Sequence, residues 1–243
     1  MKKSNFWISV LAVVIAFVGG FLFANALNRS ELINLKAENE RLINSAQAAE
    51  NPSNQELSDE EIKQKIADAD RNPDNFEFQK SLGIGLYRYA TIKQNSELLL
   101  DVERLLKRAY EKNPQDQSVL VFYGNTLFDI GFAKKDNEKF DQARKIYQEA
   151  LMQEPKDVDI QTDYGLTFFY ETPPRDDQAI VELQKALSLK PDHERSLQYL
   201  AQIYARKNNK TETERYLAEL KKVNPQNPII NQLQAPASNI TNQ

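Results

Sequence analysis

The sequence predicts an all-α fold: a stack of repeated helical hairpins behind one apolar N-terminal helix. Three observations favour this class. A short apolar phrase with a small residue at its centre recurs along residues 75–233. A proline follows each copy of the phrase after a second helical segment. Near the N-terminus, residues 6–24 carry no charge and are mostly apolar.

The composition favours a binding protein over an enzyme. There are no cysteines, which excludes disulfides, thiolate catalysis and iron–sulfur clusters. His193 is the only histidine, so a catalytic triad or a multi-histidine metal site has little to draw on, and we expect this residue in an exposed turn. The net charge of −4 argues against nucleic acid as the main partner, because phosphate binding needs a basic surface. We therefore expect no catalytic residue, metal or cofactor.

Residues 6–27 are expected to form a single transmembrane helix. Their uncharged core, residues 6–24, would extend roughly 28 Å as a helix, close to the hydrocarbon thickness of a bilayer. Lys2 and Lys3 precede it, so the positive-inside rule places residues 1–5 in the cytoplasm. We expect a single-pass protein of the inner (plasma) membrane whose remaining residues are periplasmic or otherwise extracytoplasmic.

A second interpretation of this segment stays open. Ala24-Asn25-Ala26 has the A-x-A form of a signal-peptidase site. The helix is therefore either an uncleaved signal anchor or a signal peptide that is removed after Ala26. Both interpretations export the rest of the chain, so the expected location is the same.

Two features of this region are compatible with a homodimer. Residues 28–57 predict a juxtamembrane helix and a linker, and Leu35 and Leu42 have the spacing of a short coiled coil. Small residues recur at every fourth position of the apolar helix, which lets two membrane helices approach closely, although such residues are common in membrane helices. These small residues are Ala12, Ala16, Gly20 and Ala24.

The repeat is clearest at three glycines. Gly83, Gly124 and Gly165 are 41 residues apart, in "SLGIGLY", "FYGNTLF" and "DYGLTFF", and Ala201 follows 36 residues later in "YLAQIYA". A glycine inside a helix costs about 1 kcal/mol relative to alanine, so we interpret this position as the place where two helices pack closely. Each hairpin then ends at a proline, which cannot continue a helix. These prolines are Pro114, Pro155, Pro191 and Pro225.

This pattern resembles the tetratricopeptide repeat (TPR), in which a glycine of helix A is followed by alanines of helix B and a final proline. In the second repeat the matching residues are Gly124, Ala143, Tyr147, Ala150 and Pro155. The resemblance implies a TPR superhelix of about four helix-turn-helix repeats. The expected repeats are residues 76–116, 117–157, 158–193 and 194–227, within a TPR domain at 75–233.

Two further elements flank the repeats. A capping helix is expected over residues 58–74, with Ser58 as its N-cap and Glu61 three residues later, and residues 234–243 are expected to be a disordered tail. The first two repeats are seven residues longer than the usual 34, so either both helices lengthen by a turn or the connecting loop grows.

The resemblance also implies a concave groove lined by the A helices, where a protein or peptide would bind. Tyr87, Phe128 and Phe169 are 41 residues apart and would form an aromatic row along it. The alternative is that these rings pack inside the hairpins. The full set of expected partner-binding residues is Lys80, Tyr87, Arg88, Asn125, Phe128, Asp129, Phe169, Tyr170, Gln202 and Arg206.

The expected function is that of a non-catalytic, membrane-tethered adaptor that binds a partner protein or peptide in this groove. Among anchored TPR proteins, the chain resembles the TPR domain of bacterial cytochrome c-type biogenesis proteins in "DVDIQTDYGLTFFY", in its long early repeats and in its final "NPQNPIINQL". That resemblance implies binding of an unfolded apocytochrome. The alternative is a homodimerising structural protein that assembles an envelope complex.

Overall fold

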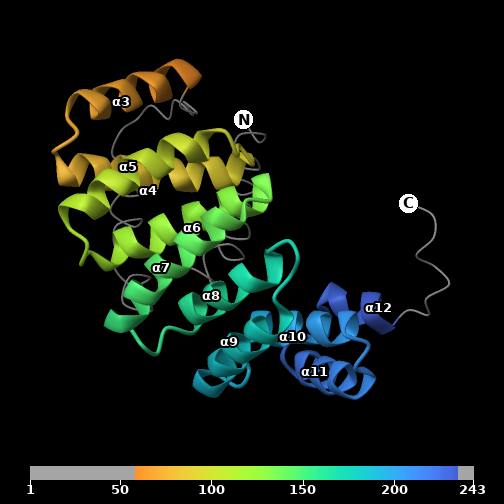
Figure 1. The fold of residues 1–243 in the computed structure, drawn as a ribbon. Coiled ribbons are helices and arrows are strands. Elements are labelled where there is room, and N and C mark those ends of the chain that lie inside the picture. The colour runs from red at the N-terminus through yellow and green to blue at the C-terminus, as the bar shows by residue number, and fades with distance from the viewer. Residues whose placement is uncertain (1–57, 235–243) are drawn as a thin grey trace, which may run out of the picture. The chain divides into compact units, whose positions relative to one another are not determined.

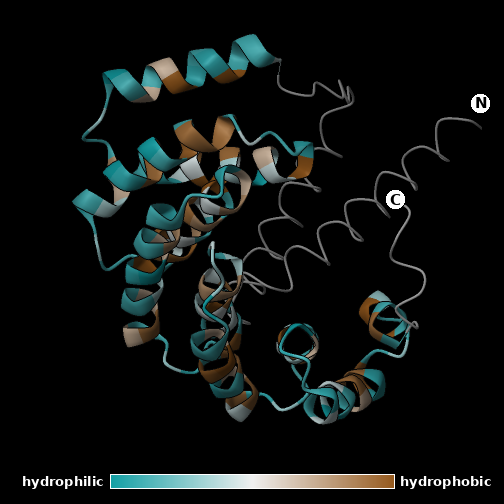
Figure 2. Ribbon diagram, turned by 45° about the vertical axis from the view of Figure 1, so that its right-hand side comes forward, coloured by the Kyte–Doolittle hydropathy of each residue, from teal (hydrophilic) through white to brown (hydrophobic). Residues whose placement is uncertain are grey.

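The computed structural model describes residues 58–234, which form α-helices α3 to α12 and contain no strand (Figure 1). The predicted all-α class is confirmed for this part of the chain. The residues divide between Pro114 and Gln115 into two compact units. Each helix carries both hydrophobic and hydrophilic residues, as expected for helices that bury one face (Figure 2).

Several expectations lie outside the described residues: the membrane helix, the juxtamembrane helix with its coiled coil, the homodimer contacts and the end of the tail. Within residues 58–234, no helix combines the length and the apolar character needed to cross a bilayer.

The first unit contains α3 (Asp59–Arg71), α4 (Phe76–Lys93) and α5 (Leu98–Lys112). Ser58 caps α3 as predicted: its backbone N–H donates to Glu61 Oε2 over 2.8 Å, and the Glu61 N–H donates to Ser58 Oγ over 3.3 Å. The buried residues of α3 recur with helical periodicity, at Ile62, Ile66 and Ala69. Helix α3 is therefore an amphipathic cap on the first hairpin.

Two polar contacts attach α3 to that hairpin. The buried Gln79 of α4 donates from Nε2 to the Ala69 carbonyl over 2.7 Å, which satisfies a backbone acceptor at the end of α3. Asp70 accepts from Arg104 and Arg108 of α5, over 3.0 Å and 2.7 Å respectively. These cations lower the pKa of the Asp70 carboxyl more than its partial burial raises it.

The second unit contains three hairpins and a final short helix. The hairpins are α6 (Gln117–Lys134) with α7 (Asn137–Gln153), α8 (Val158–Tyr170) with α9 (Asp176–Leu189), and α10 (Glu194–Arg206) with α11 (Lys210–Val223). Helix α12 (Pro228–Gln234), which the sequence interpretation missed, buries Ile230 against α10 and α11. Helix α8 contacts both α6 and α10, so the A helices of this unit form one continuous layer.

The seven extra residues of the second repeat lengthen its helices. Helices α6 and α7 have 18 and 17 residues, and only Lys135 and Asp136 separate them. Helices α10 and α11 have 13 and 14 residues. The long hairpin therefore extends α6 past Phe128 by a further turn, which places Phe132 on the same helix face.

The glycine positions lie where the two helices of a hairpin are closest. A Cβ atom added at Gly124 would be 2.7 Å from Tyr147 Cε1, and one at Gly83 would be 2.8 Å from Leu106 Cδ2. Carbon atoms that are not bonded pack at about 3.5–4.0 Å, so neither site has room for a side chain. This confirms the interpretation of these glycines as close-packing residues.

Candidate protein-interaction face

The A helices α6, α8 and α10 carry a connected row of aromatic rings, which we call the aromatic ladder. Tyr170 lies at its centre, with ring centroids 4.9 Å from Phe132, 5.8 Å from Phe128 and 4.8 Å from Phe169. Phe169 in turn lies 5.0 Å from Tyr199. All four contacts are edge-to-face, the favoured geometry for aromatic pairs.

The ladder connects the protein core to solvent. Phe128 is half-buried and also contacts Phe140, a fully buried ring of α7, with centroids 5.6 Å apart. At the outer end, the Phe132 side chain is 57% exposed although it contacts Tyr170. Phe128 therefore packs on Phe140 of its own hairpin and on Tyr170 of α8.

Polar groups fix the rings in place. The Tyr170 and Tyr199 hydroxyl oxygens are 2.6 Å apart, and burial raises the pKa of Tyr170. The Arg206 guanidinium lies over the Phe169 ring at 4.5 Å and forms an ion pair with Asp176. Arg206, predicted to flank the groove, thus holds a ladder ring and bridges two hairpins.

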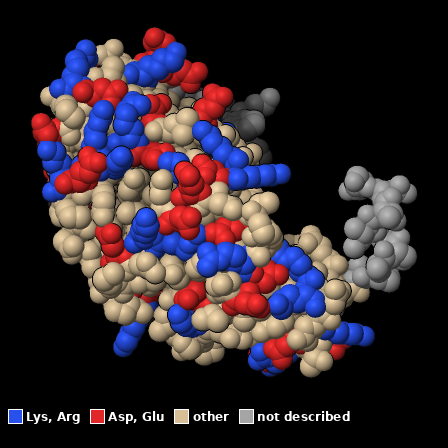
Figure 3. All heavy atoms as spheres, viewed as in Figure 1, with Lys and Arg blue, Asp and Glu red and all other residues tan. Residues whose placement is uncertain are grey.

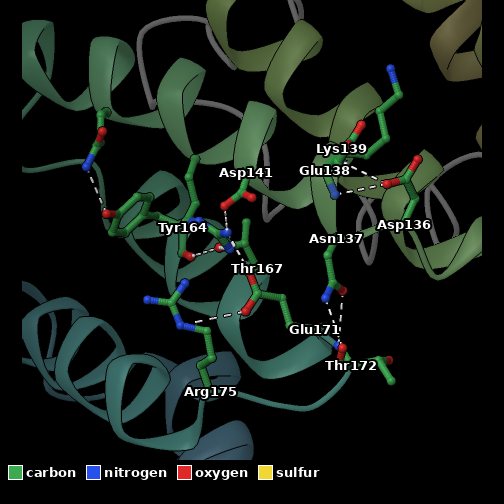
Figure 4. A network of polar contacts seen from close by, with 12 residues as sticks. Asp136, Asn137, Glu138, Lys139, Asp141, Tyr164, Thr167, Glu171, Thr172 and Arg175 are labelled. Carbon is green, nitrogen blue, oxygen red and sulfur yellow. Dashed lines mark hydrogen bonds and ion pairs between the residues drawn. The ribbon is translucent and has the colours of Figure 1, made fainter.

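The end of α8 is held by a buried polar network that follows Tyr170 directly (Figure 4). Arg144 of α7 donates to Glu171 over 2.5 Å and to Thr167 Oγ1 over 3.1 Å. Its guanidinium and that of Arg175 lie over the Phe168 ring, at 4.5 Å and 4.8 Å. Because Glu171 and Arg144 are both buried, this network fixes the helix end that presents the central ladder ring.

The amide of Asn137 clamps the loop that follows. It accepts from the Thr172 backbone N–H over 3.1 Å and donates to the Thr172 carbonyl over 2.9 Å, as the dashed lines in Figure 4 show. These two hydrogen bonds tie the α8–α9 loop to the start of α7. The Thr172–Pro173 peptide bond in this loop is cis.

A second group of side chains joins α8 to α10, and we call it the α8–α10 seam. The Asp163 carboxylate accepts from Arg195 Nη1 over 2.5 Å. His193 Nε2 is 3.1 Å from Asp159 Oδ1, and His193 Nδ1 is 2.9 Å from Ser196 Oγ. The Ser196 and Thr162 hydroxyl oxygens are 2.9 Å apart.

His193 differs from the sequence-based expectation. It was expected in an exposed turn but is 6% exposed and is the N-cap residue of α10. At the same position of the repeat, the Asp116 and Asp157 side chains accept from backbone N–H groups of α6 and α8. The His193 ring makes no such bond and lies against α8 instead. The position of His193 in the repeat, where α6 and α8 have an N-cap aspartate, was a better guide to its structural role than the local sequence "KPDH".

Asn125, a predicted partner-binding residue, points into its own hairpin. Its Oδ1 accepts from the Tyr147 hydroxyl over 2.8 Å, and the residue is 7% exposed. Asp129 and Gln202 are half-buried on α6 and α10. The structure brings together only part of the predicted second-unit set: Phe128, Phe169, Tyr170 and Arg206.

The remaining predicted residues lie on α4 of the first unit. Lys80, Tyr87 and Arg88 are all half-buried, and the Lys80 ammonium is 5.8 Å from the centroid of Phe76. Sequence reasoning missed Phe132, Tyr199, Asp163 and Arg195. The i, i+4 spacing from Phe128 could have indicated Phe132.

Charges of both signs are interspersed on the face shown in Figure 3, without a large patch of either. Among residues 58–234, no three histidine or acidic side chains are grouped so that they could hold a metal ion. The candidate site in this part of the chain is the aromatic ladder, with the Asp163–Arg195 ion pair of the seam on the neighbouring helices.

These features indicate the class of protein: an all-helical stack of hairpins of the kind that serves as a protein-interaction scaffold. Residues 177–235 match the family model described as a tetratricopeptide repeat. Together with the fold, this match supports a TPR-type protein-interaction scaffold. The sequence has no significant match among curated proteins.

Solved structures share the fold at low sequence identity. The chain is similar to residues 41 to the end of MamA from Desulfovibrio magneticus RS-1, with a TM-score of 0.54 and 16% identity over 68% of this chain and 84% of that one. It is also similar to a thermophilic TPR protein of Thermus thermophilus, with a TM-score of 0.52 and 15% identity over 71% and 86% of the two chains. At these identities the likeness establishes the fold alone.

Proposed function

We propose that this protein is a non-catalytic, membrane-tethered adaptor that binds a partner protein or peptide on the aromatic ladder. The observation that carries the proposal is the ladder itself, a connected row of five rings that packs on the buried Phe140 ring at Phe128 and reaches solvent at Phe132. It lies on the A helices of a TPR-type stack.

The physical case rests on what aromatic side chains offer a ligand. They provide a large contact area at a low entropic cost, and they dominate the energetics of many protein interfaces. Here the rings are held by the Tyr170–Tyr199 hydrogen bond and by the Arg206 guanidinium, so little further ordering is needed on binding. An extended or helical segment with apolar side chains fits this surface.

The location and the partner are finer parts of the proposal. The apolar run at residues 6–24 supports a single membrane span, with the TPR domain on the periplasmic side of the inner membrane. The resemblance to cytochrome c-type biogenesis proteins in "DVDIQTDYGLTFFY", in the long early repeats and in the final "NPQNPIINQL" supports an unfolded apocytochrome as the partner. An unfolded chain of this kind would expose the apolar side chains that the ladder fits.

A binding experiment with haem-free, reduced cytochrome c tests the proposal. We expect the full-length chain to bind it and the Phe132→Ala, Phe169→Ala double variant to bind at least tenfold more weakly, because two rings of the ladder are lost. Met152→Ala is the matched control, since this residue of α7 is exposed and apolar but lies outside the ladder.

Two outcomes would contradict the proposal in different ways. Unchanged affinity of a folded double variant, checked by its circular dichroism, would exclude the ladder as the binding surface. Binding of other unfolded chains but not of apocytochrome would exclude the partner while keeping the surface. If neither binds and crosslinking gives a dimer that depends on Leu35 and Leu42, the assembly-protein alternative is supported.

A further inference from the structure

The α8–α10 seam is polar along its whole length. From the start of both helices it runs through Asp159 and His193, then Thr162 and Ser196, to the Asp163–Arg195 ion pair. Phe128 and Phe132 of α6 contact Tyr170 of α8, and Phe169 of α8 contacts Tyr199 of α10, so aromatic contacts occur at both joints of the A-helix layer. The α8–α10 joint adds the polar seam to its aromatic contacts.

Asp163 lies in surroundings that are poor for a carboxylate. It is 7% exposed, and the only cation with an ion pair to it within the described residues is Arg195. Two other carboxylates act on it, Asp159 from its own helix and Asp129 from α6. A buried charge is costly unless it is well compensated, and here like charges add to that cost.

The groups around Arg195 favour its charge. Burial lowers the pKa of Arg195, but the charge of Asp163 and its hydrogen bond oppose this, and the net shift is upward. Arg195 therefore stays charged, and Asp163 is the member of the pair that changes. Burial, with help from Asp159 and Asp129, raises the pKa of Asp163 to about 7 against the opposing effect of Arg195.

We propose that the α8–α10 seam is a pH-responsive joint, in which the Asp163–Arg195 ion pair opens and closes with the protonation of the Asp163 carboxyl. The deprotonated carboxylate holds Arg195 against α8. The protonated acid leaves the guanidinium without its counter-charge. The Arg195 side chain is 21% exposed, which gives its guanidinium a route to water.

Protonation changes both the joint and the neighbouring ladder. Uptake of one proton gives the Asp163–Arg195 pair one net positive charge. Tyr170, the central ring of the ladder, follows Asp163 on α8 and pairs through its hydroxyl with Tyr199, which follows Arg195 on α10. Acidification would thus loosen one inter-hairpin link and make this part of the A-helix face more positive, whatever partner binds there.

The direct test is a side-chain NMR titration of the full-length chain. We expect the carboxyl carbon of Asp163 to titrate with a midpoint between about pH 6 and 8, far above the ordinary value for an aspartate. The Arg195 Nε resonance should move with the same midpoint and become insensitive to pH in this range in Asp163→Asn. A carboxyl midpoint below pH 5, or an Arg195 resonance that does not follow it, would overturn the proposal.

Unfolding equilibria give a second, independent readout. A raised pKa in the folded state contributes stability that is present at low pH and lost as the pH rises through about 7. Between pH 5.5 and 8, the unfolding constant of the wild type should therefore rise about thirtyfold relative to that of Asp163→Asn. Other groups titrate in both proteins, so the difference isolates Asp163.

Asp176→Asn is the matched control. Asp176 also bridges the third and fourth hairpins through an arginine, Arg206, but no buried carboxylate is involved. This variant should keep the pH dependence of the wild type. If Asp163→Asn and the wild type show parallel curves, the joint does not exist, and if the variant fails to fold, the wild-type NMR midpoint still decides.

Discussion

The α6–α7 and α8–α9 hairpins carry the same glycine at the same place in the repeat, but they pack around it differently. A Cβ atom at Gly124 would be 2.7 Å from a ring carbon of Tyr147. At Gly165 it would be 3.2 Å from the Cβ atom of Glu182. The α6–α7 hairpin closes on a rigid buried ring, whereas the α8–α9 hairpin closes on aliphatic carbons with slightly more room.

Each hairpin adds one polar contact next to its glycine. In the first, Tyr147 donates to Asn125 over 2.8 Å, which satisfies a buried hydroxyl. In the second, Gln161 donates to Glu182 Oε2 over 2.9 Å. The difference teaches that the glycine sets how closely two helices approach, while the residue facing it decides which polar partner the hairpin needs.

The largest expected effect is at Gly124. Gly124→Ala should lower the free energy of unfolding by about 2–3 kcal/mol, because overpacking a tight core displaces a ring that cannot bend aside. Gly165→Ala should cost less, about 1 kcal/mol, because its neighbours are 0.5 Å further away. Chemical denaturation of the full-length chain would measure both.

Gly85→Ala is the control for helix propensity, since a Cβ atom there meets nothing within 4 Å. It should stabilise α4 by about 0.5–1 kcal/mol. Equal losses for Gly124→Ala and Gly165→Ala would show that the two hairpins do not differ in tightness.

The repeat was predictable because it rests on spacing. Gly83, Gly124 and Gly165 mark close approaches that any TPR-like hairpin needs, so their positions indicated all-α hairpins and close packing. The pattern could not show whether the seven extra residues lengthen helices or a loop, because both options satisfy the same spacing. Nor did it indicate α12, which follows Pro225, the proline that ends the fourth repeat.

The site was less predictable because it depends on which face of a helix a residue occupies. The repeat phase predicted Phe128, Phe169 and Tyr170 on one face of the A helices, and the structure brings these three rings into contact. The repeat phase could not show that the Asn125 side chain accepts a hydrogen bond from Tyr147 across its own hairpin. The Asp163–Arg195 pair joins residues 32 positions apart in two different hairpins, and no local signal links them.

A smaller effect is expected from the Tyr147–Asn125 hydrogen bond of the α6–α7 hairpin. Tyr147→Phe should cost about 1–2 kcal/mol, because the buried Oδ1 of Asn125 loses its donor. Asn125→Ala should cost a similar amount, since the Tyr147 hydroxyl loses its Asn125 acceptor. A double-mutant cycle measured by denaturation would show whether the two losses are coupled.

The same variants test where Asn125 acts. If it faces the hairpin interior, Asn125→Ala should lower stability and leave the affinity for a bound partner within about twofold at temperatures where the protein is folded. A large loss of affinity in a stable variant would show that Asn125 contributes to partner binding.

The smallest expected effect is at Gln161, which makes the polar contact of the α8–α9 hairpin. Gln161→Ala should lower the free energy of unfolding by only about 0.5–1 kcal/mol, because Glu182 keeps a second partner in Lys185, 2.9 Å away. The Lys185→Ala, Gln161→Ala double variant should lose more than the sum of the single variants, since the Glu182 carboxylate is then left without either donor. Additive losses would show that Glu182 is satisfied by water. The α8–α9 hairpin would then differ from the α6–α7 hairpin in the solvation of its polar contact as well as in its tightness.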